Sequence, residues 1–100
     1  MLFRSISVNA NQVTVTGNIV KNSGQDITAA AGIRVYTGCT DVVVTGNRAY
    51  DDQGVKTQEY GYREYGTADY NLIVGNDFRG NKTTSIVTVG ANTVNANNIT

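Results

Sequence analysis

The stretch Val-Val-Val-Thr-Gly-Asn, residues 42–47, decides the fold. In the matching stretch 13–18, Val13 and Val15 alternate with threonines, which is the period of two expected of a β-strand with one buried face. Glycine and asparagine follow at once in both stretches, and these residues suit turns, so each strand is predicted to end there. Further copies of the pattern, an apolar residue, any residue, Gly or Ala, and then Asn, lie at 73–76 and 94–97.

On both sides of this motif, the sequence repeats with a period of 29 residues. Residues 13–41 laid over residues 42–70 agree at nine of 29 positions, whereas about two would agree by chance in such a biased composition. Each copy contains about three short strand-like segments and no helical pattern. We therefore predict one domain over residues 1–100, built from repeats at about 13–41, 42–70 and 71–91 with partial copies at both ends.

Three short strands cannot close a core alone, but stacked repeats let each strand pair in parallel with its copy in the next repeat. Such stacking places identical side chains above one another. Asparagine gains most from this arrangement, because its amide both donates and accepts hydrogen bonds. The sequence therefore predicts an all-β solenoid of about three coils with an asparagine ladder. The predicted ladder contains Asn18, Asn47, Asn76 and Asn97.

The composition agrees with strands and turns. The chain has 13 Val, 13 Thr, 12 Asn and 11 Gly but no Pro in 100 residues, which favours pleated surfaces and turns over a helical bundle. Eight Lys+Arg balance eight Asp+Glu, so no long-range field favours nucleic acid or a membrane surface. Histidine is absent, which removes the commonest general base and metal ligand.

The Val-Val-Val-Thr-Gly-Asn stretch (42–47), Ile-Val-Gly-Asn-Asp (73–77), the Gly-Ile-Arg-Val strand (32–35) and the asparagine ladder resemble the right-handed parallel β-helix of the pectate lyase-like superfamily. The resemblance covers about residues 3–99 and suggests its C-terminal coils. It implies the fold, and it implies an extracellular or virion-associated location, although the chain shows no signal peptide. The superfamily contains polysaccharide lyases, hydrolases and epimerases, phage tailspikes and adhesins, so the fold alone selects no function.

A stack of about three coils has two ends, each with apolar interior and unpaired strand edges. No capping helix is visible in the sequence. Two explanations follow: the chain is a piece of a longer enzyme or tailspike, or other copies cover the ends. We therefore expect a homo-oligomer formed through the ends or sides of the solenoid.

The candidate binding residues gather in and after the most polar stretch, residues 50–60. Its carboxylates offer ligands for calcium or for acid–base chemistry, and its cations offer contacts to an acidic sugar, while a solvated loop is the alternative explanation. Adjacent aspartates point to opposite faces of an extended chain and make a poor pair. The candidates are Tyr50, Asp51, Asp52, Lys56, Glu59, Tyr60, Arg63 and Glu64.

Tyrosines and arginines also fall in register one repeat apart. Tyr36 matches Tyr65, which indicates either stacking between coils or a sugar-binding surface, with Tyr50 and Tyr60 expected to be the more exposed tyrosines. Arg34 matches Arg63, and stacked like charges need a partner. That partner is expected to be Asp41, Glu59, Glu64 or the carboxylate of an oligouronate.

Glu64 occupies the inward position that Val35 takes one repeat earlier. A buried carboxylate is costly unless it is paired, so we expect Arg63 or Arg34 to contact Glu64, or the strand to bulge.

Without histidine, the histidine-containing signatures of epimerases and polygalacturonases are missing, and no catalytic residue is assigned. The sequence favours a structural or carbohydrate-contacting module without a complete active site and with no cofactor; calcium is possible but unsupported. The alternatives are a fragment of a polysaccharide lyase, hydrolase or epimerase acting on acidic polysaccharide, and a segment of a phage tailspike or adhesin. Neither nucleic acid nor a membrane is an expected partner.

Overall fold

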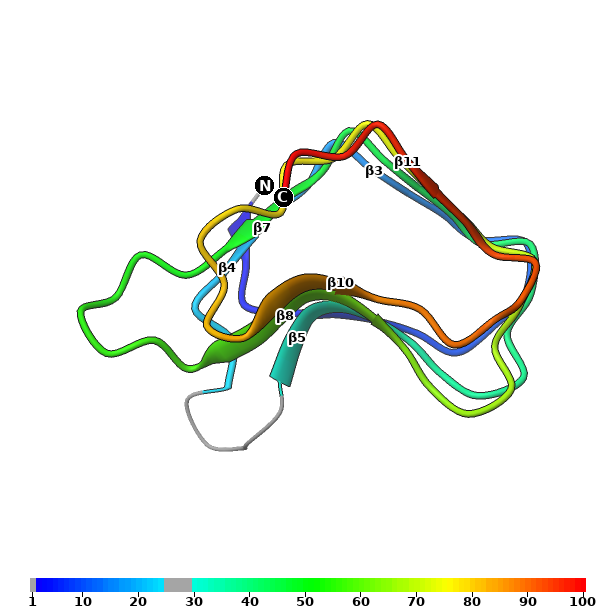
Figure 1. The fold of residues 1–100 in the computed structure, drawn as a ribbon, viewed down its shortest axis with the longest axis horizontal. Helices are drawn as coiled ribbons and strands as arrows, with labels where there is room; N and C mark the ends of the chain where they lie inside the picture. Colours follow the sequence, from blue (N-terminus) through cyan, green and yellow to red (C-terminus); the bar gives the residue numbers. More distant parts are fainter. Residues whose placement is uncertain (1, 25–29) are drawn as a thin grey trace.

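The computed structural model describes residues 2–24 and 30–100 (Figure 1). This part of the chain consists of short β-strands joined by turns and contains no helix, so none of it could cross a membrane as a helix. The strands are β1 (Leu2–Phe3), β2 (Ile6–Val8), β3 (Thr14–Thr16), β4 (Ile19–Lys21), β5 (Ala30–Val35), β6 (Val43–Thr45), β7 (Arg48–Tyr50), β8 (Gln58–Glu64), β9 (Leu72–Val74), β10 (Thr84–Val87) and β11 (Val94–Ala96).

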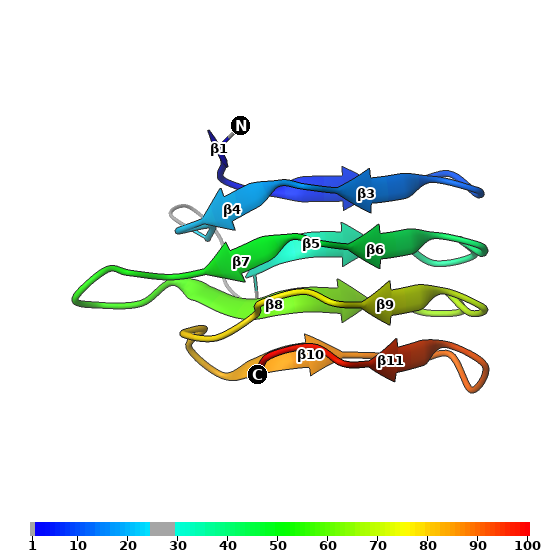
Figure 2. The same ribbon diagram turned by 90° about the horizontal axis from the view of Figure 1, so that it is seen from above.

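The strands form three sheets, in the orders β1-β4-β7, β2-β5-β8-β10 and β3-β6-β9-β11. Every strand pair in them is parallel. Figure 2 shows the strands following one another in four layers. We call these layers tier 1 (residues 6–21), tier 2 (30–50), tier 3 (58–78) and tier 4 (84–99). The expectation of an all-β chain with parallel strands is confirmed.

The register explains the repeat seen in the sequence. Val15 pairs with Val44 and Val44 with Ile73, and each step spans one period. Tier 4 is shorter, because Ile73 pairs with Asn95 only 22 residues later. In the second sheet Ile33 pairs with Tyr62, again one period apart. The repeat therefore sets the neighbours of the third-sheet strands in tiers 1 to 3 and of β5 and β8, whereas β2 pairs with β5 at a step of 27 residues.

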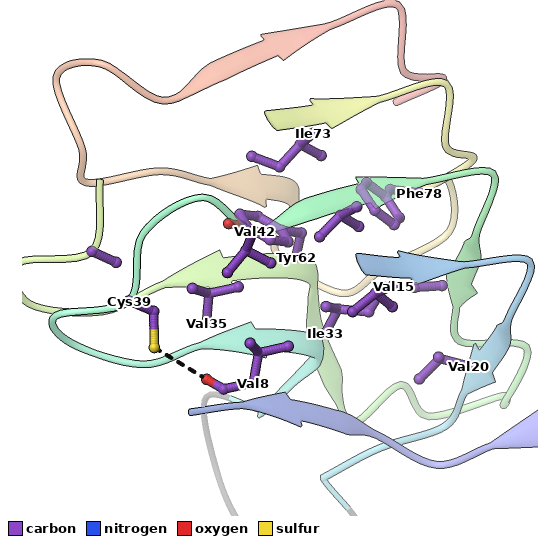
Figure 3. Close-up of a cluster of buried hydrophobic side chains, with 13 residues drawn as sticks. Val8, Val15, Val20, Ile33, Val35, Cys39, Val42, Tyr62, Ile73 and Phe78 are labelled. Carbon is purple, nitrogen blue, oxygen red and sulfur yellow. Dashed lines mark hydrogen bonds between the residues drawn. The ribbon is translucent and has the colours of Figure 1, made fainter. Parts of the chain in front are cut away.

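The core lies between the three sheets, where a cluster of buried side chains from their strands and turns packs together (Figure 3). Valine and isoleucine dominate it, which fits their preference for pleated, half-buried strands. Burying each of these side chains contributes about 1.5–3 kcal/mol. The cluster contains Val8, Val15, Val20, Ile33, Val35, Cys39, Val42, Val44, Ala49, Tyr62, Ala68, Ile73 and Phe78.

Asparagines form a hydrogen-bonded column at the turn after the third sheet. The Nδ2 group of Asn18 donates to Oδ1 of Asn47 at 3.1 Å, and Asn47 donates in the same way to Asn76 at 3.0 Å. The fourth member is Asn98, whose Oδ1 accepts from Asn76 Nδ2 at 2.9 Å. The prediction of Asn97 as the fourth member was therefore wrong by one residue.

The error has a conformational cause. Val94 pairs with Leu72 and Ala96 with Val74, so Asn97 falls opposite Gly75, the turn residue before the column. Gly75 has a φ of 69°, and Asn97 adopts a φ of 55°. Asparagine tolerates this left-handed region better than most residues, so it takes the place of the turn glycine.

Candidate functional site

The polar loop that follows β7 is held together by Asp51. This carboxylate is buried and accepts hydrogen bonds from the backbone amides of Gln53, Thr57 and Gln58, at 2.9, 2.8 and 2.8 Å. The side chain of Gln53 also donates to both of its oxygens. Asp51 is therefore a structural cap inside the loop, and its oxygens do not face a ligand.

The electrostatics of Asp51 follow from these bonds. Burial acts to raise the pKa of the Asp51 carboxyl, but the hydrogen bonds from the backbone amides of Gln58, Gln53 and Thr57 outweigh it. The net result is a pKa below the ordinary value. The loop thus favours the ionised carboxylate.

The other charged residues of the loop face different neighbours. Asp52 is exposed and bonds Asn22 and Lys21, and these two hydrogen bonds lower the pKa of its carboxyl. Lys56 donates to the carbonyl oxygen of Asp51. The opposite burial of Asp51 and Asp52 agrees with the expectation that neighbouring aspartates point apart.

Glu59 lies on β8 and contacts the next tier. Its carboxylate accepts a hydrogen bond from the Thr83 hydroxyl and forms an ion pair with Lys82 at 3.5 Å. The bond from Thr83, and then the charge of Lys82, lower the pKa of Glu59 against the smaller opposing effect of burial. Glu59 therefore helps to hold β8 of tier 3 against the segment that leads into tier 4.

These carboxylates do not converge on a metal position. Among the described residues, no three histidine, cysteine, aspartate or glutamate side chains lie close enough to hold a metal ion together. Asp51 already accepts amide donors on both oxygens, which leaves it a poor calcium ligand. The described residues thus do not fit a calcium ion, which the sequence analysis had kept as a possible ligand.

A second group of candidate residues lies on the outer side of the sheet that contains β5 and β8. Arg34 and Arg63 pair directly across these strands, and each alternates with buried neighbours. We call this group the Tyr–Arg strip: Arg34, Tyr36, Tyr60, Arg63 and Tyr65.

Aromatic rings surround the arginine of tier 3. The Cζ atom of Arg63 lies 5.1 Å from the ring centroid of Tyr60 and 4.6 Å from that of Tyr65. The Tyr65 ring in turn lies 5.7 Å from the Tyr36 ring, tilted by 33°. Stacking of Tyr36 and Tyr65 between tiers is thus present, and cation–π contacts hold the Arg63 guanidinium in place.

No acid neutralises the strip within residues 2–24 and 30–100. The ion pairs described there involve other arginines and lysines, and neither Arg34 nor Arg63 takes part in one. The Nε atom of Arg34 is buried without a hydrogen-bond partner among these residues. The three expected protein partners, Asp41, Glu59 and Glu64, make no ion pair with either arginine, so a protein partner was wrongly expected, and the oligouronate carboxylate stays a prediction.

Glu64 points inward, as its match with Val35 predicted, and is 1% exposed. One carboxylate oxygen accepts from the backbone amides of Val89 and Gly90 at 3.0 and 3.1 Å. The other oxygen accepts from three side chains at 2.9 to 3.0 Å: Tyr62 hydroxyl, Asn71 Nδ2 and Thr93 hydroxyl.

Neither of the two expected solutions is found, because no arginine pairs with Glu64 and Glu64 pairs in register with Val35, without a bulge at this position. Uncharged donors satisfy the carboxylate instead, three of them from tier 4. Burial, and then the neighbouring Glu64 carboxylate, raise the pKa of the Tyr62 phenol well above its ordinary value. Glu64 therefore belongs to the core and has no accessible face for a ligand.

The tyrosines differ from their expected exposure. Tyr50 and Tyr60 were expected to be the more exposed tyrosines, but both are half-buried. Tyr70, which was not expected to be exposed, is the most exposed tyrosine at 61%. Tyr50 packs under Arg48, whose Cζ lies 4.2 Å from its ring centroid. Arg48 thus covers part of the Tyr50 ring, and Arg63 covers part of the Tyr60 ring.

Of the predicted site residues, the structure brings together Tyr60 with Arg63, and Lys56 with Asp51. It places Asp51, Asp52 and Lys56 in the loop, Glu59 at the tier joint and Glu64 in the core. Arg34, Tyr36 and Tyr65 were not among the eight candidate binding residues, although their match with residues one period away had already suggested a sugar or uronate contact.

Comparisons with protein-family models, with curated proteins and with solved structures found no match to this chain. The function therefore rests on the geometry of the chain itself.

Proposed function

We propose that the chain is a short right-handed parallel β-helix that acts as a carbohydrate-contacting module, without a complete active site, for acidic polysaccharides. Three stacked parallel sheets around one core support the fold part of the proposal. Parallel strands joined by crossover connections are right-handed in nearly all proteins, which supports the hand. The asparagine column adds the side-chain register that such a stack needs.

The observation that carries the ligand proposal is the Tyr–Arg strip, in which two arginines lie in register with no acid paired to either in the described chain. Like charges on neighbouring strands repel, so an anion placed between them is stabilised. A guanidinium binds a carboxylate through two parallel hydrogen bonds. The carboxylate of a uronic acid residue satisfies both requirements.

Tyrosine supplies the remaining chemistry of a sugar site. Its ring covers the apolar face of a pyranose while its hydroxyl bonds the sugar hydroxyls. Tyr36 and Tyr65 extend the strip along the strand direction from the arginine pair. A sugar chain lying over the strip would thus contact rings and guanidinium groups together.

The test is isothermal titration of the chain with oligogalacturonate and oligomannuronate, and with a neutral oligosaccharide of the same length. We expect binding of the acidic sugars that weakens as salt is raised. Arg63→Gln and Arg34→Gln should each weaken it at least tenfold, since a charged hydrogen bond contributes about 1.5–3 kcal/mol. Arg79→Gln is the matched control, because Arg79 pairs with Asp77 on another surface.

Equal binding of neutral and acidic sugars, or equal losses in Arg79→Gln and Arg63→Gln, would show that the strip does not select anions. If no sugar bound at millimolar concentration, the carbohydrate-contacting function would be wrong and a purely structural role would remain. Release of unsaturated product, seen as a rise in ultraviolet absorbance, would overturn the absence of an active site.

A further inference from the structure

The Tyr–Arg strip is longer along the strands than across them. Its members on and directly after β8 are Tyr60, Arg63 and Tyr65, and at ~3.3 Å per residue the segment from the first to the last covers at most ~16 Å. Across the strands the strip spans only β5 and β8, which are neighbours at about 4.8 Å (Figure 2). A sugar chain that contacts the whole strip therefore has to follow the strands.

The arginine column stops on both sides of the strip. Ser7 of tier 1 pairs with Arg34, and Val87 of tier 4 pairs with Arg63. Neither Ser7 nor Val87 carries a charge, so a chain lying across the strands would meet two arginines and no further cation in this column. The cationic part of the strip is thus one position, at which a single carboxylate can lie between two guanidinium groups.

Uncharged groups flank this position along the strands. On one side the rings of Tyr36 and Tyr65 stack at 5.7 Å, and the exposed hydroxyls of Thr37 and Thr67, 3.1 Å apart, follow them in the chain. On the other side lies the ring of Tyr60. Rings and hydroxyls suit the apolar faces and the hydroxyl groups of neutral sugars. They suit a second carboxylate poorly, because the face of an aromatic ring is negative and a carboxylate that loses water without a cation is costly.

We propose that the strip recognises a sugar chain that lies along β5 and β8 and carries one uronic acid residue between neutral sugars. The uronate lies at the arginine pair, and its neutral neighbours lie over the tyrosine rings. This ligand class rests on the proposed function, since the strip must bind acidic polysaccharide at all. It narrows that function to chains in which uronic acid alternates with neutral sugar.

Isothermal titration of the whole chain with three hexasaccharides tests the ligand class. Hyaluronan hexasaccharide alternates glucuronate with N-acetylglucosamine, hexagalacturonate carries a carboxylate on every sugar, and chitohexaose is the neutral chain of N-acetylglucosamine. We expect the hyaluronan hexasaccharide to bind about tenfold more tightly than hexagalacturonate, whose additional carboxylates meet rings instead of cations. We expect chitohexaose to bind at least tenfold more weakly than the hyaluronan hexasaccharide, because it lacks the charged hydrogen bonds.

Substitutions in the two directions test how the sugar chain lies. Tyr36→Leu, along the strands from the arginine pair, should weaken binding of the hyaluronan hexasaccharide about fivefold. It should leave the binding of methyl glucuronide, a single uronate measured by NMR titration, unchanged, whereas a merely structural role of Tyr36 would weaken both. Ser7→Ala and Val87→Ala, across the strands, are the matched controls and should leave the hexasaccharide affinity unchanged. Circular dichroism and the urea midpoint report whether each variant is folded.

Three results would overturn the proposal. If hexagalacturonate bound as tightly as the hyaluronan hexasaccharide while chitohexaose did not bind, the proposed function would stand but neutral neighbours would not be required. If Ser7→Ala or Val87→Ala weakened hexasaccharide binding and Tyr36→Leu did not, the sugar chain would lie across the strands. If neither acidic hexasaccharide bound at millimolar concentration, the proposed function itself would fail, and the narrower ligand class with it.

Discussion

Asp51 and Glu64 are both buried carboxylates, but one organises a loop and the other joins two tiers. The partners of Asp51 lie at most seven residues away along the chain. Three of the partners of Glu64 lie 25 to 29 residues away. Loss of the first should therefore loosen a local turn, and loss of the second should release tier 4 from the stack.

The largest effect is expected for Glu64→Ala. It leaves two backbone amides, the Asn71 amide and two hydroxyls without an acceptor inside the core. Each buried donor left without an acceptor costs about 1–3 kcal/mol, so the total loss of stability should exceed that of Asp51→Asn. Urea unfolding should show this loss, and hydrogen exchange should show faster exchange of the Val89 and Gly90 amides.

Glu64→Gln is the control for charge and shape. It keeps the volume and one acceptor oxygen but places an NH₂ group against the donors, so its loss should lie between wild type and Glu64→Ala. A stability equal to wild type in both variants would contradict the role of Glu64 in joining the tiers.

Asp51→Asn should have a smaller and more local effect. The amide keeps one acceptor oxygen, but the charge-assisted bonds from Thr57 and Gln58 weaken. A loss of about 1–2 kcal/mol is expected in urea unfolding. Exchange should accelerate at Thr57 and Gln58 and stay slow at Val89, the reverse of the Glu64→Ala pattern. Acceleration at Val89 as well would mean that the loop and tier 4 are one cooperative unit.

The dependence of the free energy of unfolding on pH above neutrality should report on Tyr62, which donates to Glu64. Because the pKa of Tyr62 is raised in the folded chain, the unfolded chain loses this proton first as the pH rises. Stability from Tyr62 is therefore present below about pH 10, the ordinary tyrosine pKa, and falls above it. Tyr62→Phe should cost about 1 kcal/mol at pH 7 and make the alkaline decline shallower. If stability fell equally steeply with pH in Tyr62→Phe, the alkaline loss of stability would come from groups other than Tyr62.

The acid limb should report on the loop, with the smallest effect. The pKa values of Asp51 and Asp52 are lowered in the folded chain, so the unfolded chain binds protons more readily. Stability from these groups is present above about pH 4, the ordinary aspartate pKa, and is lost as the pH falls below it. Urea unfolding between pH 5 and 2 should show a shallower decline in Asp51→Asn than in wild type; equal slopes would contradict the contribution of Asp51.

The sequence predicted the strands, their parallel order and most of the register, because residues 42–47 carry both the strand period and the turn. It missed the register of tier 4, since Asn97 and Asn98 are adjacent and only the backbone conformation tells which one replaces a glycine. It also predicted that Glu64 faces inward but not its donors. Three of those donors, Val89, Gly90 and Thr93, come from tier 4, whose shorter step the 29-residue period does not describe.

The candidate site was predicted less well than the fold. Sequence proximity gathered Asp51, Lys56 and Glu64 into one group, but Asp51 and Lys56 stay within the loop, whereas Glu64 is buried in the core. The match of Arg34 with Arg63 was visible one period apart, yet the contact of Arg63 with Tyr60 and Tyr65 depends on side-chain packing that no spacing reveals.

The in-register pairing of tiers 2 and 3 also bears on how such a chain can change its length during evolution. A tandem duplication of residues 42–70 would insert one repeat that meets its own copy residue for residue on one side. On the other side it would keep the existing pairs, Val44 with Ile73 and Asn47 with Asn76. Gene duplication of a whole period would thus be far less disruptive than the insertion of a single residue within a strand, which would turn every following side chain of that strand to the opposite face.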